Sequence, residues 1–425
     1  MGNERSFYGW KMVGALWFLY LLNMGFPLYG GVVINTYMMK EIAMDRSTFG
    51  MGFTLLNFFV GVPSVMVAMA IMKWGVRATF GIGGGLLLIG TLWMAFVASQ
   101  PWHYLVGFGV IVGGGIGCST IVPLSTAVTR WFKKYRGRAM ALTLTASGFA
   151  GFIGAPLMNQ LLTLNGGNWR QAWLVVAGIV IAAALIAFLF VKERPEDLGQ
   201  VPDGVEETND GSAIANPLAT KHTWTPSEAY RTPAFWLVAV ASFACQYPFF
   251  FFTAHWILHL RGMGISPADA AMAMGLFTMG GIFGRLIGGT LIDKIPARFV
   301  FMMGICCYFV GSVLAVSVTS DSLMVAFAAA ILYGAGFGWT FVCLNTMVGN
   351  YWGAASFPKI NGTLLLISAI VCSPAGIVGG KIFDAFKSYQ LAFYLNVAIC
   401  VVGIIALVFA TMPRKEVAQQ EAVIR

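Results

Sequence analysis

Twelve long apolar runs, separated by shorter polar connections, constrain this chain more than any other feature of its sequence. A helix that crosses a bilayer needs about 20 largely apolar residues, because the hydrocarbon core offers its backbone no water. Six runs precede a polar stretch and six follow it. They lie near residues 10–33, 50–72, 78–98, 102–129, 138–163, 170–191, 234–259, 268–291, 299–318, 322–350, 360–383 and 389–412.

The composition also indicates that lipid surrounds this chain. Hydrophobic residues make up 58% of the chain and charged residues 10%, against roughly 45–50% and about 25% in soluble domains. The formal net charge is +9, but the basic residues are spread in small groups between apolar runs. This distribution indicates membrane topology and excludes a nucleic-acid-binding surface.

We therefore predict an all-α integral membrane protein with twelve transmembrane helices. Residues 1–191 form an N-terminal six-helix bundle, 192–233 a cytoplasmic linker, 234–412 a C-terminal six-helix bundle and 413–425 a cytoplasmic tail. With both termini in the cytoplasm, 19 Lys and Arg residues fall on the inner side and 6 on the outer side, as the positive-inside rule requires. We expect a multi-pass protein of the cell (inner) membrane.

The two halves of the sequence resemble each other at a constant offset of 221 positions. The offset relates Lys73 to Lys294, Arg77 to Arg298 and Trp131 to Trp352, and it relates Gly113, Gly115 and Gly117 to Gly334, Gly336 and Gly338. A constant offset over some sixty residues indicates a duplicated six-helix unit. The glycines also suit close helix packing.

The residue types that metal sites and enzymes need are scattered. All seven cysteines lie within apolar runs without metal-ligand spacing, and His103, His222, His255 and His259 form no cluster. An integral-membrane enzyme, the alternative of a different class, needs such a constellation. We therefore expect no metal, no cofactor and no enzymatic activity.

One cation, Arg285, lies inside a predicted span. All 17 acidic residues lie in loops, tails or at helix ends, so no buried carboxylate is expected beside it. An arginine at mid-membrane costs at least about 2.5–3.5 kcal/mol on insertion scales, and it faces the protein interior. The sequence therefore predicts that Arg285 binds an anionic substrate.

Several segments resemble the major facilitator superfamily and, within it, the bacterial members of the monocarboxylate porter and oxalate/formate exchanger-like branch. The segment from Lys73 to Arg77 is similar to the superfamily motif after the second helix, with Met72 where an Asp is usual. The segment from Trp131 to Gly148 is similar to the entry into the fifth helix of monocarboxylate porters. Further similar segments are Tyr8–Trp10, Asn168–Ala172, Arg194–Gly199 and Arg231–Trp236.

The resemblance implies two pseudo-symmetric six-helix bundles that transport a small organic anion by alternating access, with Arg285 as the substrate-binding arginine. Exchangers of oxalate-like dianions carry a second cation in the eleventh helix, where this chain has Ser368. A single cation favours a monocarboxylate such as lactate, pyruvate, formate or a short-chain acid. Another organic anion, or a drug exported by an efflux pump, is the alternative substrate.

Polar residues elsewhere in the spans could contact the substrate, although hydrogen bonding between helices is the alternative for each of them. Helix position selects Asn23, Tyr29, Ser119, Thr120, Thr145, Gln246, Tyr247, His255, Tyr333 and Asn345. Basic and acidic residues near helix ends could clasp the opposite bundle and act as a gate. These are Lys73, Arg77, Arg136, Arg138, Asp293, Lys294 and Arg298.

The energy source is left open between proton symport, anion exchange and uniport. Animal proton-linked porters use a first-helix lysine and an aspartate four residues before the arginine, and this chain has Val33 and Gly281 there. His255 is the one titratable group near the path with a suitable unperturbed pKa. Besides the anion and a possible proton, we expect membrane lipid as the only partner and a monomeric protein.

Overall fold

The computed structural model describes residues 7–42, 44, 46–204, 218–220, 222–372 and 374–413, and within them all regular structure is helical. We call α1 to α9 the first half. Its helices are α1 (Gly9–Met24), η1 (Gly25–Gly30), α2 (Gly31–Glu41), α3 (Arg46–Gly61), α4 (Ser64–Phe96), α5 (Pro101–Tyr104), η2 (Leu105–Val112), α6 (Gly113–Ser119), α7 (Ile121–Trp131), α8 (Arg136–Leu164) and α9 (Trp169–Phe190).

Three short helices follow in the linker, and we call the six helices after them the second half. The linker helices are η3 (Pro195–Leu198), η4 (Pro202–Gly204) and α10 (Pro226–Arg231). The second half contains α11 (Pro233–Gly262), α12 (Pro267–Leu291), α13 (Ala297–Val316), α14 (Leu323–Cys372), α15 (Ala375–Phe386) and α16 (Gln390–Phe409).

Ten runs of helix among the described residues are long and apolar enough to cross a membrane. Two of them exceed one crossing, because Met51–Phe96 has 46 residues and Leu323–Phe386 has 64. Each contains a glycine with non-helical backbone, Gly75 (φ 87°, ψ 172°) and Gly353 (φ 78°, ψ 171°). These glycines adopt a conformation that side chains disfavour, and dividing both runs at them would give twelve spans.

The sides of the molecule are apolar. Large hydrophobic side chains such as Phe96, Phe152 and Phe188 are more than half exposed, and Trp236 and Val402 are exposed on the second half. Water-soluble monomers rarely expose apolar surface on this scale. Lipid tails would cover these side chains at no cost in hydration, as expected for helices that span a bilayer.

The duplication predicted from the sequence reappears in helix packing. A Cβ atom added to Gly117 would lie 2.7 Å from the carbonyl oxygen of Val60, and one added to Gly338 would lie 2.0 Å from that of Gly281. The offset of 221 relates Gly117 to Gly338 and Val60 to Gly281, so the second contact repeats the first. Two neighbouring contacts follow the same offset: Gly113 with Leu56 and Gly334 with Phe277, and Gly115 with Leu87 and Gly336 with Tyr308.

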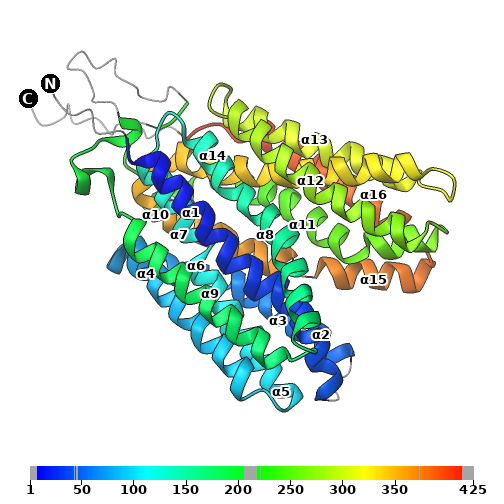
Figure 1. The fold of residues 1–425 in the computed structure, drawn as a ribbon. Helices are drawn as coiled ribbons and strands as arrows, with labels where there is room; N and C mark the ends of the chain where they lie inside the picture. The colour runs from blue at the N-terminus through cyan, green and yellow to red at the C-terminus, as the bar shows by residue number, and fades with distance from the viewer. Residues whose placement is uncertain are drawn as a thin grey trace, which may run out of the picture.

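Contacts between the halves are related in the same way. The Gly61 position lies against Ala369 and the Gly148 position against Ile282, and the offset converts one contact into the other. In Figure 1 the helices of the first half (blue to green) form one group and those of the second half (green to red) another. The groups meet through α8 against α12 and through α4 and α7 against α14.

Candidate functional site

Arg285 lies on α12, where the halves meet, and its side chain is only 5% exposed. It makes no hydrogen bond or ion pair with any residue that the structure describes, and its buried Nε has no partner. Its guanidinium carbon lies 5.5 Å from the centre of the Phe337 ring. A ring face attracts a cation weakly, so the five N–H donors remain available to an anion.

Titratable side chains of both halves interact electrostatically with this guanidinium. Its electrostatic neighbours include Tyr20 of α1 and Tyr29 of η1 in the first half, and Tyr308 and Cys245 in the second. These groups are neutral near pH 7 at their ordinary pKa values. Tyr29 was predicted as a substrate contact and stays a prediction, while Tyr20 was not among the predicted residues.

Two glycines leave room for the guanidinium. A Cβ atom on Gly281 of α12 would lie 3.4 Å from Arg285 Nη1, and one on Gly148 of α8 would lie 3.7 Å from it. Larger side chains at these positions would occupy the space beside the guanidinium. The sequence places both glycines in spans, but only the packing of α8 on α12 shows that they border the same group.

The other predicted contacts in the first half are engaged in local hydrogen bonds. Asn23 Nδ2 donates to the Ser119 carbonyl at 3.4 Å, and the Asn23 Oδ1 is buried without a partner. The Ser119 and Thr120 hydroxyls donate to carbonyls one turn earlier. Thr145 accepts from the Trp17 indole at 3.0 Å. Of these atoms, the orphaned Asn23 Oδ1 retains capacity for a ligand.

In the second half, Gln246 belongs to a polar cluster that joins α11 to α14. Its Nε2 donates to Ser242 Oγ at 3.3 Å, and Ser242 Oγ lies 2.7 Å from Ser368 Oγ. Tyr247, the next residue, lies against Phe243 with ring centres 5.1 Å apart. Gln246 follows Cys245, an electrostatic neighbour of Arg285, along α11.

The remaining predicted contacts serve packing within the second half. His255 bonds the Gly376 carbonyl (2.8 Å) and the Tyr389 hydroxyl (3.2 Å). Tyr333 bonds Ser312 and Asn396, and Asn345 bonds the Phe341 carbonyl and Asn361. Neither His255 nor Tyr333 is an electrostatic neighbour of Arg285.

Asp293 joins the halves at the end of the molecule where α1 begins. Its carboxylate accepts from the backbone N–H of Gly137 at 2.7 Å and of Arg138 at 3.0 Å, and it lies 3.9 Å from Arg138 Nε. These N–H groups open α8, so the helix dipole also favours the anion. Burial raises the pKa of the Asp293 carboxyl to about 6, against the lowering effect of the Arg138 and Gly137 N–H groups.

A second contact between the halves involves Arg136. This side chain is 4% exposed, and its Nη1 donates to Asn350 Oδ1 of α14 at 2.9 Å. The four other predicted gating residues make no such contact. Arg298 donates to Val408 and Arg77 stacks on Phe188, each within its own half, while Lys73 and Lys294 are exposed.

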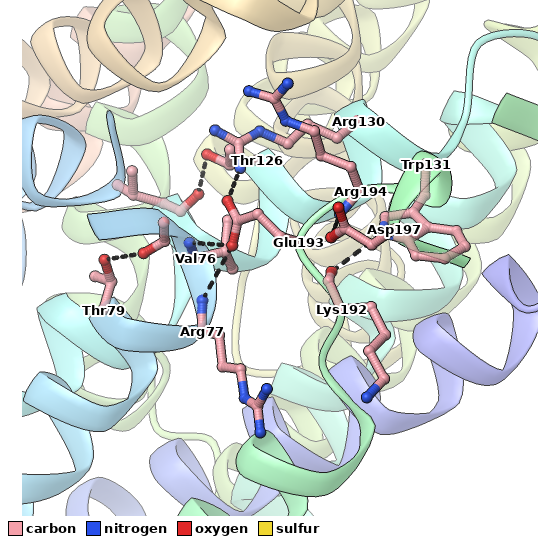
Figure 2. Close-up of polar contacts among 12 residues, drawn as sticks. Val76, Arg77, Thr79, Thr126, Arg130, Trp131, Lys192, Glu193, Arg194 and Asp197 are labelled. Atoms are coloured by element: carbon pink, nitrogen blue, oxygen red, sulfur yellow. Dashed lines mark hydrogen bonds and ion pairs between the residues drawn. The ribbon is translucent and has the colours of Figure 1, made fainter. Parts of the chain in front are cut away.

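Glu193, in the linker after α9, provides the carboxylate that the motif around Arg77 lacks. Figure 2 shows it between α4 and Arg130 of α7. Its Oε2 accepts from the Val76 N–H at 2.7 Å and from the Arg77 N–H at 3.4 Å, and its Oε1 pairs with Arg130. The sequence placed Glu193 among eight linker acids, and only the chain path singles it out.

The linker is also anchored at Asp203. Its carboxylate accepts from three successive backbone N–H groups, those of Lys133 (2.8 Å), Lys134 (2.7 Å) and Tyr135 (3.3 Å). A run of N–H groups that converge in this way forms an anion-binding nest. The linker therefore holds the turn that leads into Arg136 and the contacts between the halves.

Known proteins resemble most of the chain. The family model described as Major Facilitator Superfamily matches residues 16–376 and 262–423. Monocarboxylate transporter 13 of Bos taurus is 24% identical over 331 residues, which cover 78% of this chain and 72% of that protein. Human (Homo sapiens) monocarboxylate transporter 7 is 23% identical over 91% of this chain and 83% of its own length.

Among solved structures, a variant of the E. coli fucose:proton symporter FucP has the same fold. Its TM-score is 0.69 at 15% sequence identity, and the match covers 95% of this chain and 98% of that one. At this identity the likeness concerns the fold alone.

Proposed function

This chain belongs to the major facilitator superfamily of multi-pass membrane transporters, and we propose that it transports a small monocarboxylate whose carboxylate group binds Arg285. The observation that carries this proposal is a buried guanidinium without a counter-ion among the described residues. A guanidinium can bind a carboxylate through two parallel hydrogen bonds. The names of the relatives agree with this substrate class.

The charge of the site favours a monoanion. The offset of 221 relates Arg285 to Ser64, whose hydroxyl donates to the Gly362 carbonyl at 2.8 Å. The duplicated unit thus carries its cation in one copy only. Ser368, where a second cation would lie, is hydrogen-bonded to Ser242. A dianion would leave one charge without a partner in a medium of low polarity, so we favour lactate, pyruvate, formate or a short-chain acid.

We propose that residues 1–191 and 234–412 are the two six-helix bundles that move against each other around this site. The repeated contacts of Gly117 and Gly338 support this division. The excess of basic residues at the end where α1 begins supports a cytoplasmic location for both termini. On this orientation, Asp293, Arg136 and Arg138 close the cytoplasmic side, while the energy source is either a proton or an exchanged anion.

Uptake into proteoliposomes tests the proposal. Carbon-14-labelled lactate, pyruvate, formate and acetate are the probes, in vesicles loaded with the same unlabelled anion. We expect Arg285→Ala to reduce uptake to the level of protein-free vesicles, and Arg285→Lys to retain part of it, because lysine keeps the charge and loses the two-pronged geometry. Arg261→Ala is the control, since Arg261 is exposed at the end of α11.

Full uptake by a folded Arg285→Ala variant would contradict the proposal, and so would failure of every probe in the unmutated protein. Size-exclusion profiles of the detergent-solubilised variants show whether they are folded.

A further inference from the structure

We propose that a cavity between the linker and the second half binds a phosphate group, carried either by a soluble phosphate ester or by a lipid headgroup. The cavity has a volume of about 810 Å³. Arg285 is not among the described residues that line it, so the proposal does not depend on the proposed substrate. Its described lining includes Thr220 and His222 of the linker, Pro296 and Arg298 at the start of α13, Tyr351 of α14, and Thr411 after α16.

The described lining of this cavity carries positive charge and no negative charge. Arg298 belongs to it, and no Asp or Glu does. The Arg298 guanidinium is held by a hydrogen bond from Nη1 to the Val408 carbonyl at 3.1 Å, and its Cζ lies 4.6 Å from the centre of the Phe299 ring. Neither contact neutralises the charge, and a guanidinium has five N–H donors. An anion in the cavity would therefore meet a fixed cation with unused donors.

The first backbone N–H groups of α13 lie beside this cation. The N-cap residue is Pro296, which provides no side-chain cap, and its carbonyl accepts from the N–H groups of Phe299 at 3.0 Å and Val300 at 3.4 Å. The N–H groups of Ala297 and Arg298 donate to no residue that the structure describes. Free N–H groups at the start of a helix favour an anion, and the helix dipole adds to this preference.

The first half shows what such donors bind when the chain supplies an anion. The offset of 221 relates Val76 to Ala297 and Arg77 to Arg298. The N–H groups of Val76 and Arg77 donate to the Glu193 carboxylate at 2.7 and 3.4 Å, as Figure 2 shows. The same start of a helix therefore binds a carboxylate in one copy of the duplicated unit.

The second copy lacks that carboxylate. The offset relates Glu193 to Arg414, a cationic residue type at a position outside the described residues. It relates Arg130, which pairs with Glu193, to Tyr351, whose hydroxyl donates to the Ala410 carbonyl at 2.7 Å. The second half thus retains the helix start and the adjacent arginine without the internal anion. An anion from outside the chain would complete this copy.

The linker forms one wall of the cavity and adds a further donor. The Thr220 N–H donates to the Asn350 carbonyl of α14 at 2.7 Å, and the Thr220 hydroxyl accepts from the His222 N–H at 3.2 Å. These bonds fix the backbone that carries the exposed His222 imidazole at the cavity. A ligand that contacts both His222 and Arg298 would join the linker to α13.

The donors favour a phosphate over a carboxylate. A phosphate monoester has three terminal oxygens and a charge of about −1.5 to −2 near pH 7, so it can accept from the helix start, Arg298 and His222 together. A carboxylate has two oxygens and a single charge.

The size of the cavity indicates that the phosphate belongs to a larger molecule. Its volume lies in the range of small-molecule sites, roughly 300–1,000 Å³. A soluble ester would place its organic part in the cavity. A lipid would place its acyl chains along exposed apolar side chains near Arg298, such as Phe299 and Phe409, which are 44% and 66% exposed. Both sources present the same phosphate chemistry to the site.

Isothermal titration calorimetry of the full chain in detergent and phosphate-free buffer tests the proposal. The probes are glycerol 3-phosphate, adenosine monophosphate and dioctanoyl phosphatidic acid, and their phosphate-free controls are glycerol, adenosine and dioctanoylglycerol. We expect saturable binding of at least one probe and of no control. Tighter binding of phosphatidic acid assigns the site to a lipid headgroup, and tighter binding of a soluble ester assigns it to that class. Absence of saturable binding by every probe overturns the proposal.

Arg298→Gln should weaken this binding at least tenfold, because it removes a charge-assisted hydrogen bond. Lys294→Gln is the matched control. It removes the same charge from an exposed residue that is not part of the described lining, and it should change the affinity by less than about threefold, since salt screens exposed charges. Equal losses in the two variants would indicate general attraction to a basic surface and would overturn the proposal.

Ala297→Pro removes a backbone donor without changing the charge. Proline is tolerated at the first position of a helix, and Pro296 has the extended conformation (ψ 130°) that a residue before proline needs. We expect binding about fivefold weaker than in the unmutated protein. Unaltered affinity in this variant, with size-exclusion profiles that show it folded, would overturn the site at the helix start. This result stands even if Arg298→Gln does not fold.

Discussion

At the scale of single residues, the proposed function depends on a polar side chain that has no hydrogen-bond or ion-pair partner among the described residues. Arg285 is such a group, and the hydroxyl of Tyr20 in α1 interacts with it electrostatically. The hydroxyl therefore belongs to the first half while it faces a cation of the second. A substrate carboxylate between them would accept from both, which would make recognition depend on the two halves together.

We expect Tyr20→Phe to raise the KM for the transported anion about tenfold, since a hydrogen bond to a charged group contributes roughly 1.5–3 kcal/mol. Concentration-dependent uptake in proteoliposomes measures it. The matched control is Tyr104→Phe, which removes a hydroxyl that donates to the Phe49 carbonyl and should leave KM unchanged. An unaltered KM in Tyr20→Phe would remove Tyr20 from the site.

At the scale of elements, two glycines end helices where the chain passes from one span to the next. Gly75 and Gly353 have backbone angles that residues with a Cβ rarely adopt. Their surroundings differ, however. A Cβ atom at Gly75 would lie 2.7 Å from the Glu193 carboxylate, whereas at Gly353 the nearest atom is 3.8 Å away. At Gly75, both the backbone angles and the nearby Glu193 carboxylate disfavour a side chain. At Gly353, only the backbone angles do.

We expect Gly353→Ala to lower the free energy of unfolding by about 1–3 kcal/mol, the usual cost of a strained backbone. Gly75→Ala should cost more, because it also displaces the Glu193 carboxylate from the Val76 N–H. Gly178→Ala, in α9 with open space around it, is the control and should cost nothing. Thermal denaturation in detergent should rank the three variants in this order, and equal losses at Gly75 and Gly353 would contradict the role given to Glu193.

At the scale of the whole molecule, the duplicated halves close on each other unequally. Asp293 caps the start of α8 through the Gly137 and Arg138 N–H groups. The offset of 221 relates Asp293 to Met72 and Gly137 to Pro358. A proline has no N–H, so a carboxylate at position 72 would find one donor fewer. The methionine at position 72 agrees with the missing donor at Pro358.

The raised pKa of Asp293 predicts how this contact depends on pH. The folded protein holds the carboxyl at a pKa of about 6, above its ordinary value of 3.8, and so it binds more protons than the unfolded chain between these values. The resulting stabilisation is complete below pH 3.8 and is lost as the pH rises through 6. The melting temperature should therefore fall more steeply from pH 5 to pH 7 in the unmutated protein than in Asp293→Asn, and parallel curves would contradict this.

Much of the architecture could be predicted because it depends on local composition. Apolar runs must be helical in lipid, and the offset of 221 foretold the packing of Gly117 and Gly338. The sites were less predictable. Tyr333 and Asn345 were predicted substrate contacts because they are polar residues inside predicted spans. In the structure their side chains make hydrogen bonds within the second half. Nothing local distinguishes a polar side chain that faces a substrate from one that faces another helix.

The sequence by itself determined the solvent, the helices, the duplication and the presence of one intramembrane cation, since each follows from the order of residue types along the chain. Only the tertiary structure decided that Tyr20 and Gly148 of one half meet Arg285 of the other, and that Glu193 and Asp203 of the linker bind backbone N–H groups of the first half. The physical reason is distance. Electrostatic and hydrogen-bonding contacts act over a few ångströms in space, between residues that lie more than fifty positions apart in the chain.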